Sequence, residues 1–273
     1  TAAGYGGDEF TSLWPADLHV IGKDILAPPH AVYWPIMLKA LNLPLPKQIL
    51  AHGWWMSSGE KMSKSTGEVV DPLSLIEHRG VDAFRYFVMR EMTVGQDADF
   101  SLERFESRYK TDLGNDLGNL LSRLLHMVSV YENGLVPQVE LNEEFEQKIR
   151  TNFEESKVNI MNRFSTFQFN QGLEQLFGFI RSINKYADER TPWKLAKSDK
   201  PEDKQRLKTC LGVMVESLRL ANQMLAPVMP GIHTKINELM GLPPCHNWKA
   251  DLVWDFRLAG NKLGEKTILF PRE

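Results

Sequence analysis

Three runs of apolar residues with helical spacing constrain the fold of this chain more than any other feature of its sequence. The runs cover residues 113–128, 173–187 and 207–225, and within each the apolar residues recur every three or four positions. That spacing places them on one face of a helix, which must then pack against another apolar surface. A glycine or a proline follows each run and marks its end. From residue 101 onward the chain is therefore predicted to form an α-helical bundle.

The first 92 residues have a different pattern, in which short apolar runs alternate with helical stretches. Residues 16–21 and 48–51 are predicted strands, and residues 31–41 are a predicted helix between them. Asp71 and Pro72 supply the N-cap and first-turn proline of a further helix. A strand, a helix and a strand at this spacing are typical of the parallel sheets that bind nucleotides. We therefore expect an α/β region followed by an all-α region.

Composition and charge exclude several classes of protein. No apolar run reaches the roughly 18 residues of a membrane span, so no membrane association is expected. The 32 basic and 35 acidic residues give a net charge of −3, so any RNA contact must come from a local patch. Cys210 and Cys245 are too few for a disulfide framework and indicate a reducing compartment. The pair Cys245-His246 has no second Cys/His pair to complete a zinc site, so no metal site is expected.

The sequence begins without an initiator methionine and without a recognisable signal peptide. We interpret it as a part of a longer protein. The cytoplasm is the expected compartment, and the matrix of an organelle stays open because a targeting segment would lie elsewhere.

The most specific motif is the pentapeptide Lys61-Met62-Ser63-Lys64-Ser65, which stands between Gly59 and Gly67. Two lysines among small hydroxyl residues and glycines can form a loop that closes over a polyphosphate and neutralises its developing charge. The alternative is an ordinary solvated loop. Five fixed residues arise by chance in roughly one window in three million, which favours the functional interpretation.

This pentapeptide resembles the second signature motif of the class I aminoacyl-tRNA synthetases. The surrounding residues narrow the resemblance to the methionyl-tRNA synthetase family, and the similarity extends over essentially the whole chain. The similar segments are residues 21–24 (IGKD), 30–35 (HAVYWP), 59–71 (GEKMSKSTGEVVD), 82–86 (DAFRY), 116–119 (DLGN) and 260–271, which end in LFP.

The resemblance implies a two-step reaction. ATP, bound with Mg²⁺ as substrate, activates L-methionine to methionyl-adenylate, and the methionyl group then passes to tRNA(Met). Lys64 would stabilise the phosphates, with Lys61 in support. Gly22 and Asp24 lie where a strand end meets the crossover helix, the usual ligand crevice of such a sheet, and the resemblance implies that they contact the nucleotide. Asp24 could instead cap a helix, and His52 could line the ATP site or be structural.

His30 and Trp34 are four residues apart and therefore share a helical face. The resemblance implies that they form the pocket for the methionine side chain, which suits an aromatic face and a neutral imidazole. The alternative is a packed aromatic face with a core histidine. Residues 27–29 contain one residue more before His30 than is usual in the family, so the position of His30 is a departure from the pattern.

Asn119 and Arg123 are also four residues apart, and Pro192-Trp193 follows some seventy residues later. The resemblance implies that these residues read the CAU anticodon. Unstacked bases need a stacking platform and groups that read their edges, and Trp, Arg and Asn provide both. The alternative is that Asn119 and Arg123 are solvated and that Trp193 packs in the bundle.

The first signature motif of the class I synthetases is not found in this sequence. His19–Gly22 resembles it superficially but lies too close to Lys61, so we expect the N-terminal half of the catalytic domain to be supplied outside this sequence. The expected organisation is the C-terminal part of a Rossmann-like catalytic domain, a stem-contact linker, a helical anticodon-binding domain and a tail that docks back. These segments cover residues 1–92, 93–114, 115–259 and 260–273. The alternatives are a class I synthetase for leucine, valine, isoleucine or cysteine, and a non-catalytic tRNA-binding fragment.

Overall fold

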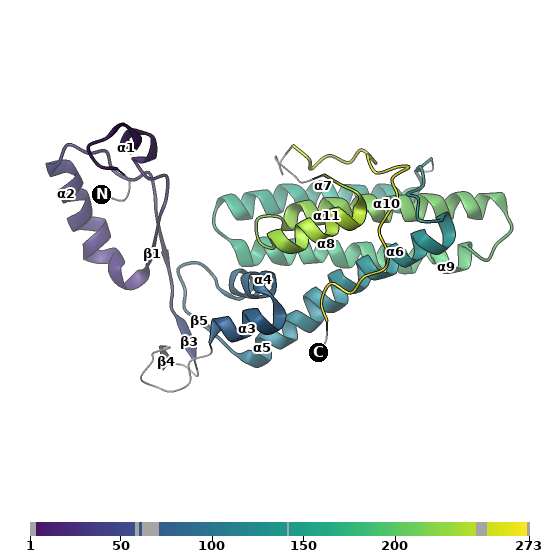
Figure 1. Cartoon of the computed structure of the whole chain (residues 1–273), viewed down its shortest axis with the longest axis horizontal. Coiled ribbons are helices and arrows are strands. Elements are labelled where there is room, and N and C mark those ends of the chain that lie inside the picture. Colours follow the sequence, from purple (N-terminus) through teal and green to yellow (C-terminus); the bar gives the residue numbers. More distant parts are fainter. Residues whose placement is uncertain (1–3, 58–59, 62–70, 141, 244–249, 272–273) are drawn as a thin grey trace. The chain divides into compact units, whose positions relative to one another are not determined.

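The computed structural model describes residues 4–57, 60–61, 71–140, 142–243 and 250–271 (Figure 1). The chain forms two compact units. Unit 1 comprises Thr1–Val69 and Glu91–Ser101, and unit 2 comprises Val70–Arg90 and Leu102–Glu273. The two units describe how the chain packs, whereas the four segments expected from the sequence were defined by the function proposed for each.

Unit 1 contains a parallel pair of strands, β1 (His19–Gly22) and β2 (Ile49–His52). The chain between them forms a short 3₁₀ turn, a π-helical stretch over Leu26–Tyr33 and helix α2 (Trp34–Ala40). The predicted strand–helix–strand order is confirmed, although the helical region begins before residue 31. Because Gly22 pairs with His52, both strands end at the same edge. Loops that follow the two strands therefore meet there.

A second small sheet completes the described part of unit 1, together with helix α1 (Asp8–Leu13). Its central strand β3 (Trp55–Ser57) pairs antiparallel with β4 (Glu60–Lys61) and parallel with β5 (Ala98–Asp99). The backbone of Lys61 thus belongs to β4, whereas Lys64 lies outside the described residues.

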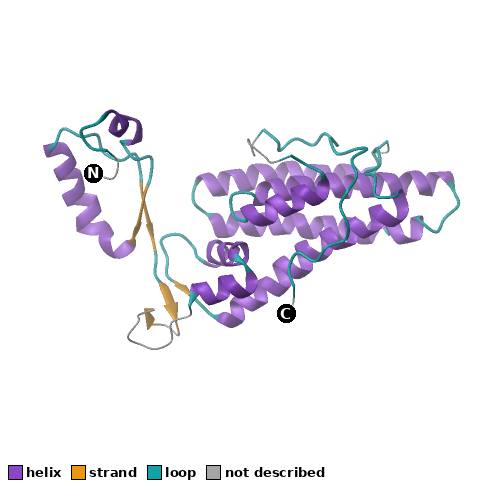
Figure 2. Ribbon diagram, viewed as in Figure 1, coloured by secondary structure: helices purple, strands orange, loops and turns teal. Residues whose placement is uncertain are grey.

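Unit 2 is helical (Figure 2). Its helices are α3 (Pro72–Arg79), α4 (Val81–Glu91, whose last residue belongs to unit 1), α5 (Leu102–Arg108), a π-helical stretch over Tyr109–Gly118 that continues into α6 (Asn119–Glu132), α7 (Glu144–Ser165), α8 (Phe169–Arg190), α9 (Pro192–Leu195), α10 (Pro201–Leu225) and α11 (Pro230–Met240). The predicted N-cap is confirmed, because the Asp71 carboxylate accepts a hydrogen bond from the backbone nitrogen of Leu73 at 3.0 Å. The three apolar runs lie in helices that include α6, α8 and α10, so the predicted bundle is also confirmed.

The core of unit 2 is centred on α10, where every residue from Thr209 to Leu225 is buried. Helices α6, α7, α8 and α11 all pack against it. The sequence did not indicate α7, because two of its five buried positions carry polar side chains, Glu146 and Ser156. None of the helices that the structure describes is long and apolar enough to cross a lipid bilayer.

A buried ionic network fastens α7 to α8. The Glu146 carboxylate accepts hydrogen bonds from Arg190 Nε at 2.8 Å and from the Tyr186 hydroxyl at 2.7 Å. Burial raises the pKa of Tyr186, so its hydroxyl remains a donor. Arg190 also pairs at 2.9 Å with Glu143, the partly exposed N-cap residue of α7, so two carboxylates of this helix face its charge.

Candidate functional site

The first candidate site lies in unit 1, at the common edge where β1 and β2 end. Two glycines there permit close approaches that a side chain would prevent. A Cβ atom on Gly22 would stand 2.5 Å from Asp24 Oδ1, and one on Gly53 would stand 1.9 Å from the carbonyl oxygen of Gln96. The loop after β1 is thus tightly folded at Asp24, and the loop after β2 lies close to the backbone that leads into β5.

Polar contacts connect these loops. Asp97 accepts from Lys23 Nζ at 2.7 Å and from the backbone nitrogen of Trp54 at 2.8 Å. The Lys23 ammonium also lies 4.5 Å from the centre of the Trp54 ring, and Trp54 Nε1 donates to Asp24 Oδ1 at 3.4 Å. The hydrogen bond from Lys23 is the main reason that the pKa of Asp97 is lowered. Through Trp54, this cluster contacts one oxygen of the exposed Asp24 carboxylate.

The structure gathers three of the predicted ATP-site residues at this edge. Gly22 and His52 are register partners, and Asp24 follows on the 3₁₀ turn. The His52 ring is turned toward its own loop, with Nδ1 2.8 Å from the carbonyl oxygen of Gly53. Of the other two predicted ATP-site residues, Lys61 and Lys64, the side chain of the first and all of the second lie outside the described part of the chain.

The predicted methionine-pocket residues lie on the helical segment after β1. Trp34 joins an aromatic cluster, with its ring centre 6.1 Å from that of Trp14 and 6.3 Å from that of His19. Its buried Nε1 has no hydrogen-bond partner among the residues described. His30 Nδ1 instead lies 2.8 Å from the carbonyl oxygen of Ile25. Trp34 thus makes its ring contacts with Trp14 and His19, neither of which was predicted for the methionine pocket.

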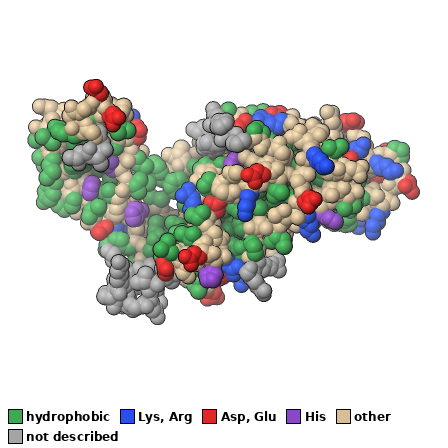
Figure 3. Space-filling model, viewed as in Figure 1, with side chains coloured by type: hydrophobic (Ala, Val, Ile, Leu, Met, Phe, Trp, Pro, Cys, Tyr) green, Lys and Arg blue, Asp and Glu red, His purple; other side chains and the backbone are tan. Residues whose placement is uncertain are grey.

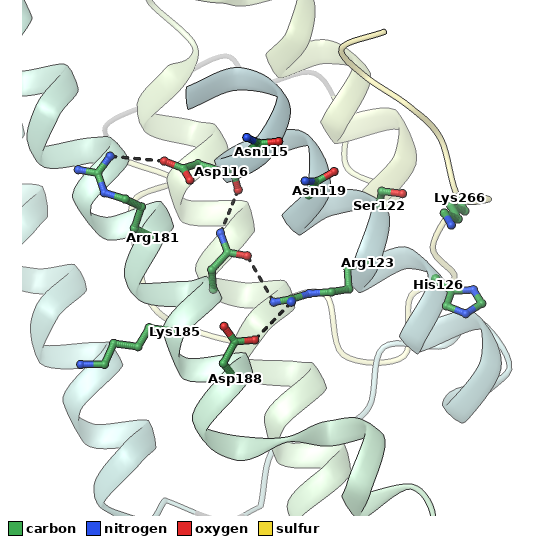
Figure 4. Close-up of a pocket in the computed structure, with 11 residues that line it drawn as sticks. Asn115, Asp116, Asn119, Ser122, Arg123, His126, Arg181, Lys185, Asp188 and Lys266 are labelled. Atoms are coloured by element: carbon green, nitrogen blue, oxygen red, sulfur yellow. Dashed lines mark hydrogen bonds and ion pairs between the residues drawn. The ribbon is translucent and has the colours of Figure 1, made fainter. Parts of the chain in front are cut away.

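The second candidate site is a groove of about 710 Å³ in unit 2 (Figure 4). It runs between α8 and the α6 segment, by which we mean α6 together with the π-helical stretch before it, and the C-terminal tail contributes one residue. The lining side chains are Asn115, Asp116, Asn119, Ser122, Arg123, His126, Arg181, Asn184, Lys185, Asp188 and Lys266. The predicted pair, Asn119 and Arg123, therefore shares one groove.

Residues of α8 hold the Arg123 guanidinium across the groove. Its Nη1 donates to Asp188 Oδ1 at 3.3 Å and its Nη2 to Asn184 Oδ1 at 3.4 Å, as Figure 4 shows. Arg123 Nε is buried and has no hydrogen-bond partner within the described residues. Burial raises the pKa of the Asp116 carboxyl, and the nearby positive charge of Arg181 partly offsets this increase. The groove is thus polar, with several cationic groups and fixed donors.

Pro192 and Trp193 begin the short helix α9, which follows a left-handed Thr191 at the end of α8. Pro192 is buried, whereas Trp193 is half-exposed. Trp193 is not among the side chains that line the groove. The structure therefore joins Asn119 and Arg123 but not Trp193 in one groove.

Sequence reasoning did not select several residues of these sites. Trp54 contacts the predicted nucleotide residue Asp24, and Asp97 in turn holds Trp54. Arg181, Lys185 and Lys266 line the groove. Each lies far along the chain from the motif that it joins, so spacing within a helix could not reveal it. Among the described residues, no group of three or more His, Cys, Asp or Glu side chains is arranged to hold a metal ion.

Comparison with protein families gives one match. A family model described as tRNA synthetases class I (M) matches residues 3–125. This range includes all of unit 1 except its first two residues, and it ends within α6.

Known proteins match over the whole chain. The methionine--tRNA ligase of Clostridium tetani is 39% identical and that of Streptomyces coelicolor is 40% identical, each over 100% of this chain. These matches cover 42% and 52% of the relatives, so the chain spans about half their length. The solved structure of Mycobacterium tuberculosis methionyl-tRNA synthetase in complex with methionyl-adenylate is 38% identical, with a TM-score of 0.93. That match covers 98% of this chain and 53% of the solved one.

Proposed function

Because this chain belongs to the class I methionyl-tRNA synthetase family, we propose that it is part of an enzyme that activates L-methionine with ATP and transfers it to tRNA(Met). The observation that carries the proposal is similarity to methionine--tRNA ligases along the entire chain. The intact Lys61–Ser65 pentapeptide is in agreement with it.

In this proposal, unit 1 belongs to the second half of a Rossmann-like catalytic domain and binds the nucleotide. Ligands of open parallel sheets bind at the carboxyl ends of the strands, where Gly22, Asp24 and His52 lie. Gly22 lets the backbone approach the nucleotide, and the Asp24 carboxylate accepts from ribose hydroxyls. Lys64, supported by Lys61, would neutralise the phosphates of ATP, which enters with Mg²⁺ as substrate.

The methionine side chain would bind beside His30 and Trp34. The aromatic cluster of Trp14, His19 and Trp34 offers ring faces and edges, with which a thioether sulfur makes favourable contacts. Trp34 Nε1 supplies a donor that is not already used by a described residue.

Unit 2 would bind the anticodon of tRNA in its groove. Asn119 presents an exposed amide, and the Arg123 guanidinium is oriented by Asn184 and Asp188 through its two Nη atoms. Such groups can read the edges of unstacked bases. The half-exposed Trp193, preceded by Pro192, would provide a stacking surface. Residues 93–114 would contact the tRNA stem.

Amino-acid-dependent ATP–pyrophosphate exchange tests the proposed specificity. The full-length protein that carries these residues should exchange with methionine and fail with leucine, isoleucine, valine and cysteine. Preference for one of the other four amino acids would identify a different class I synthetase. Binding of tRNA without exchange would identify an RNA-binding protein.

A further inference from the structure

The C-terminal tail of unit 2, residues 260–271, runs over α6 and the π-helical stretch before it. We call this tail the strap. Its first end is held by main-chain hydrogen bonds. Leu263 donates to the carbonyl oxygen of Gly134 at 2.9 Å, and Gly264 donates to that of Leu239 at 2.7 Å. This end is thus fixed both to the loop after α6 and to α11.

The other end of the strap is held by side chains. Phe270 is buried and meets the Tyr109 ring edge-on, with 5.9 Å between the ring centres. A Cβ atom on Gly118 would stand 3.1 Å from the Phe270 ring, so the glycine makes room for it. The Pro271 carbonyl accepts from the Tyr109 hydroxyl at 2.9 Å and from Arg79 Nη1 at 3.3 Å.

The stretch between these two ends is exposed and includes Lys266. Lys266 lines the same groove as Asn119 and Arg123, and Figure 4 shows it on the tail beside the helix that carries Ser122. A strap fixed at both ends therefore presents a lysine at the edge of the proposed anticodon site.

The charges of the groove distinguish Lys266 from its neighbours. Arg123 pairs with Asp188 at 3.3 Å, and Arg181 pairs with Asp116 at 3.4 Å. Lys185 lies 3.7 Å from the carboxylate of Glu189. Lys266 forms no ion pair with a side chain in the described ranges, so its positive charge is not neutralised locally.

We propose that Lys266 binds a phosphate of the RNA backbone at the groove, and that the strap is anchored in order to hold it there. The proposal rests on the proposed function of the groove in tRNA binding. A lysine ammonium is a compact point charge, which suits a phosphate better than the planar edge of a base. Phosphate contacts fix the position of a nucleic acid, whereas base contacts carry its specificity. Lys266 would thus orient the loop that Asn119 and Arg123 read.

Binding of a CAU anticodon stem-loop RNA to the full-length protein, measured by fluorescence anisotropy, tests the proposal. Lys266→Ala should weaken binding of the CAU loop and of a loop with a changed anticodon by the same factor. Loss of one phosphate contact should also lower the salt dependence, so that the ratio of wild-type to variant affinity changes about 3-fold between 50 and 200 mM salt. Lys266→Arg should largely restore both.

Lys262→Ala is the matched control, because Lys262 lies on the same strap, is exposed and does not line the groove. If Lys266→Ala and Lys262→Ala bind the RNA equally well, while the wild-type protein binds it and Arg123→Ala weakens binding, the inference about Lys266 is wrong. The proposed function of the groove would then still stand. Absence of anticodon-dependent binding in the wild-type protein would overturn the proposed function together with the inference.

The anchoring of the strap has its own test. In a Phe270→Ala background, where the strap end is released, Lys266→Ala should have little further effect on RNA binding. The melting temperature of each variant shows whether unit 2 stays folded. Additive effects of the two substitutions in folded protein would contradict the role of the anchor.

Discussion

The two units of this chain differ in how they bury apolar side chains. In unit 2, the described helices α6, α7, α8, α9 and α11 pack against α10, which is buried from Thr209 to Leu225. In unit 1, by contrast, the only buried large apolar side chains among the described residues are Ile21, Leu38 and Phe100. Figure 3 shows apolar side chains gathered on the visible surface of unit 1.

The exposed apolar residues of unit 1 concentrate on and around α2. Ile36, Met37 and Leu41 are each more than half exposed, and Val20 on β1 is 61% exposed. Several large apolar side chains exposed on one small unit are typical of a surface that contacts something else. We infer that unit 2 can fold by itself, whereas unit 1 needs a further apolar surface to reach its full stability.

The two candidate sites differ in a parallel way. The groove of unit 2 is complete in described side chains and is already crossed by hydrogen bonds. The site of unit 1 has a cluster of polar contacts around Asp97, but Lys64, the lysine that we propose to bind the phosphates, lies outside the described residues. Changes in unit 2 should therefore act on RNA binding or on the core, and changes in unit 1 on the activation of methionine.

The largest expected effect concerns the core of unit 2. Arg190→Ala would leave the Glu146 carboxylate buried without its main cationic partner, which should cost about 3–5 kcal/mol of unfolding free energy. Urea denaturation followed by circular dichroism measures this loss. Arg181→Ala, which removes half-exposed ion pairs, should cost at most about 1 kcal/mol. Similar losses in both variants would mean that the buried network does not stabilise the bundle.

The next effect concerns activation in unit 1. In the full-length enzyme, Lys64→Ala should raise the barrier to adenylate formation by about 2–4 kcal/mol, because one charge directed at the transition state is lost. Methionine-dependent pyrophosphate exchange measures the loss, and methionine affinity should change far less. The exposed Lys39→Ala is the control. Exchange within a few-fold of wild type would show that the loop does not serve the phosphates.

A smaller effect is expected from the proposed stacking surface of unit 2. Trp193→Ala should weaken tRNA recognition by about 1–3 kcal/mol, because a base loses its aromatic platform. Pyrophosphate exchange should stay near wild type, and Trp193→Phe should recover part of the affinity. Equal loss of tRNA recognition and exchange, or loss of folding, would assign Trp193 to packing instead.

The smallest effect is a local one at Asp97. Because its pKa is lowered in the folded protein, its contribution to stability is present above the unfolded pKa and is lost as pH falls through the folded pKa. The amide signal of Trp54, followed by NMR during an acid titration, should shift in that window. In Asp97→Asn this titration should disappear. A titration that survives the substitution would have another source.

The same contrast explains how much of the fold could be predicted from sequence. Helices α6, α8 and α10 were predicted because apolar side chains recur every three or four residues along each of them, although α10 also buries polar residues such as Glu216 and Arg219. Helix α7 was missed because Glu146 and Ser156 interrupt its buried face. A charged residue such as Glu146 can be buried in α7 because Arg190, which lies on α8, forms an ion pair with it.

The candidate sites were predictable only within single helices. Spacing placed Asn119 and Arg123 on one face, and both line the groove. The partners Asn184 and Asp188 come from a helix about sixty residues later, and Lys266 comes from the tail. Such proximity is set by helix packing, which no local pattern of the sequence encodes.

The most direct test of the division between the units uses residues 1–273 expressed as one chain. The CAU stem-loop RNA and its anticodon-changed control should be bound with different affinities, because unit 2 has its own core and a complete groove. Methionine-dependent pyrophosphate exchange by the same preparation should be negligible, because unit 1 leaves much of its apolar surface uncovered and catalysis depends on exact positioning. Robust exchange by this chain, or RNA binding that ignores the anticodon, would contradict the account.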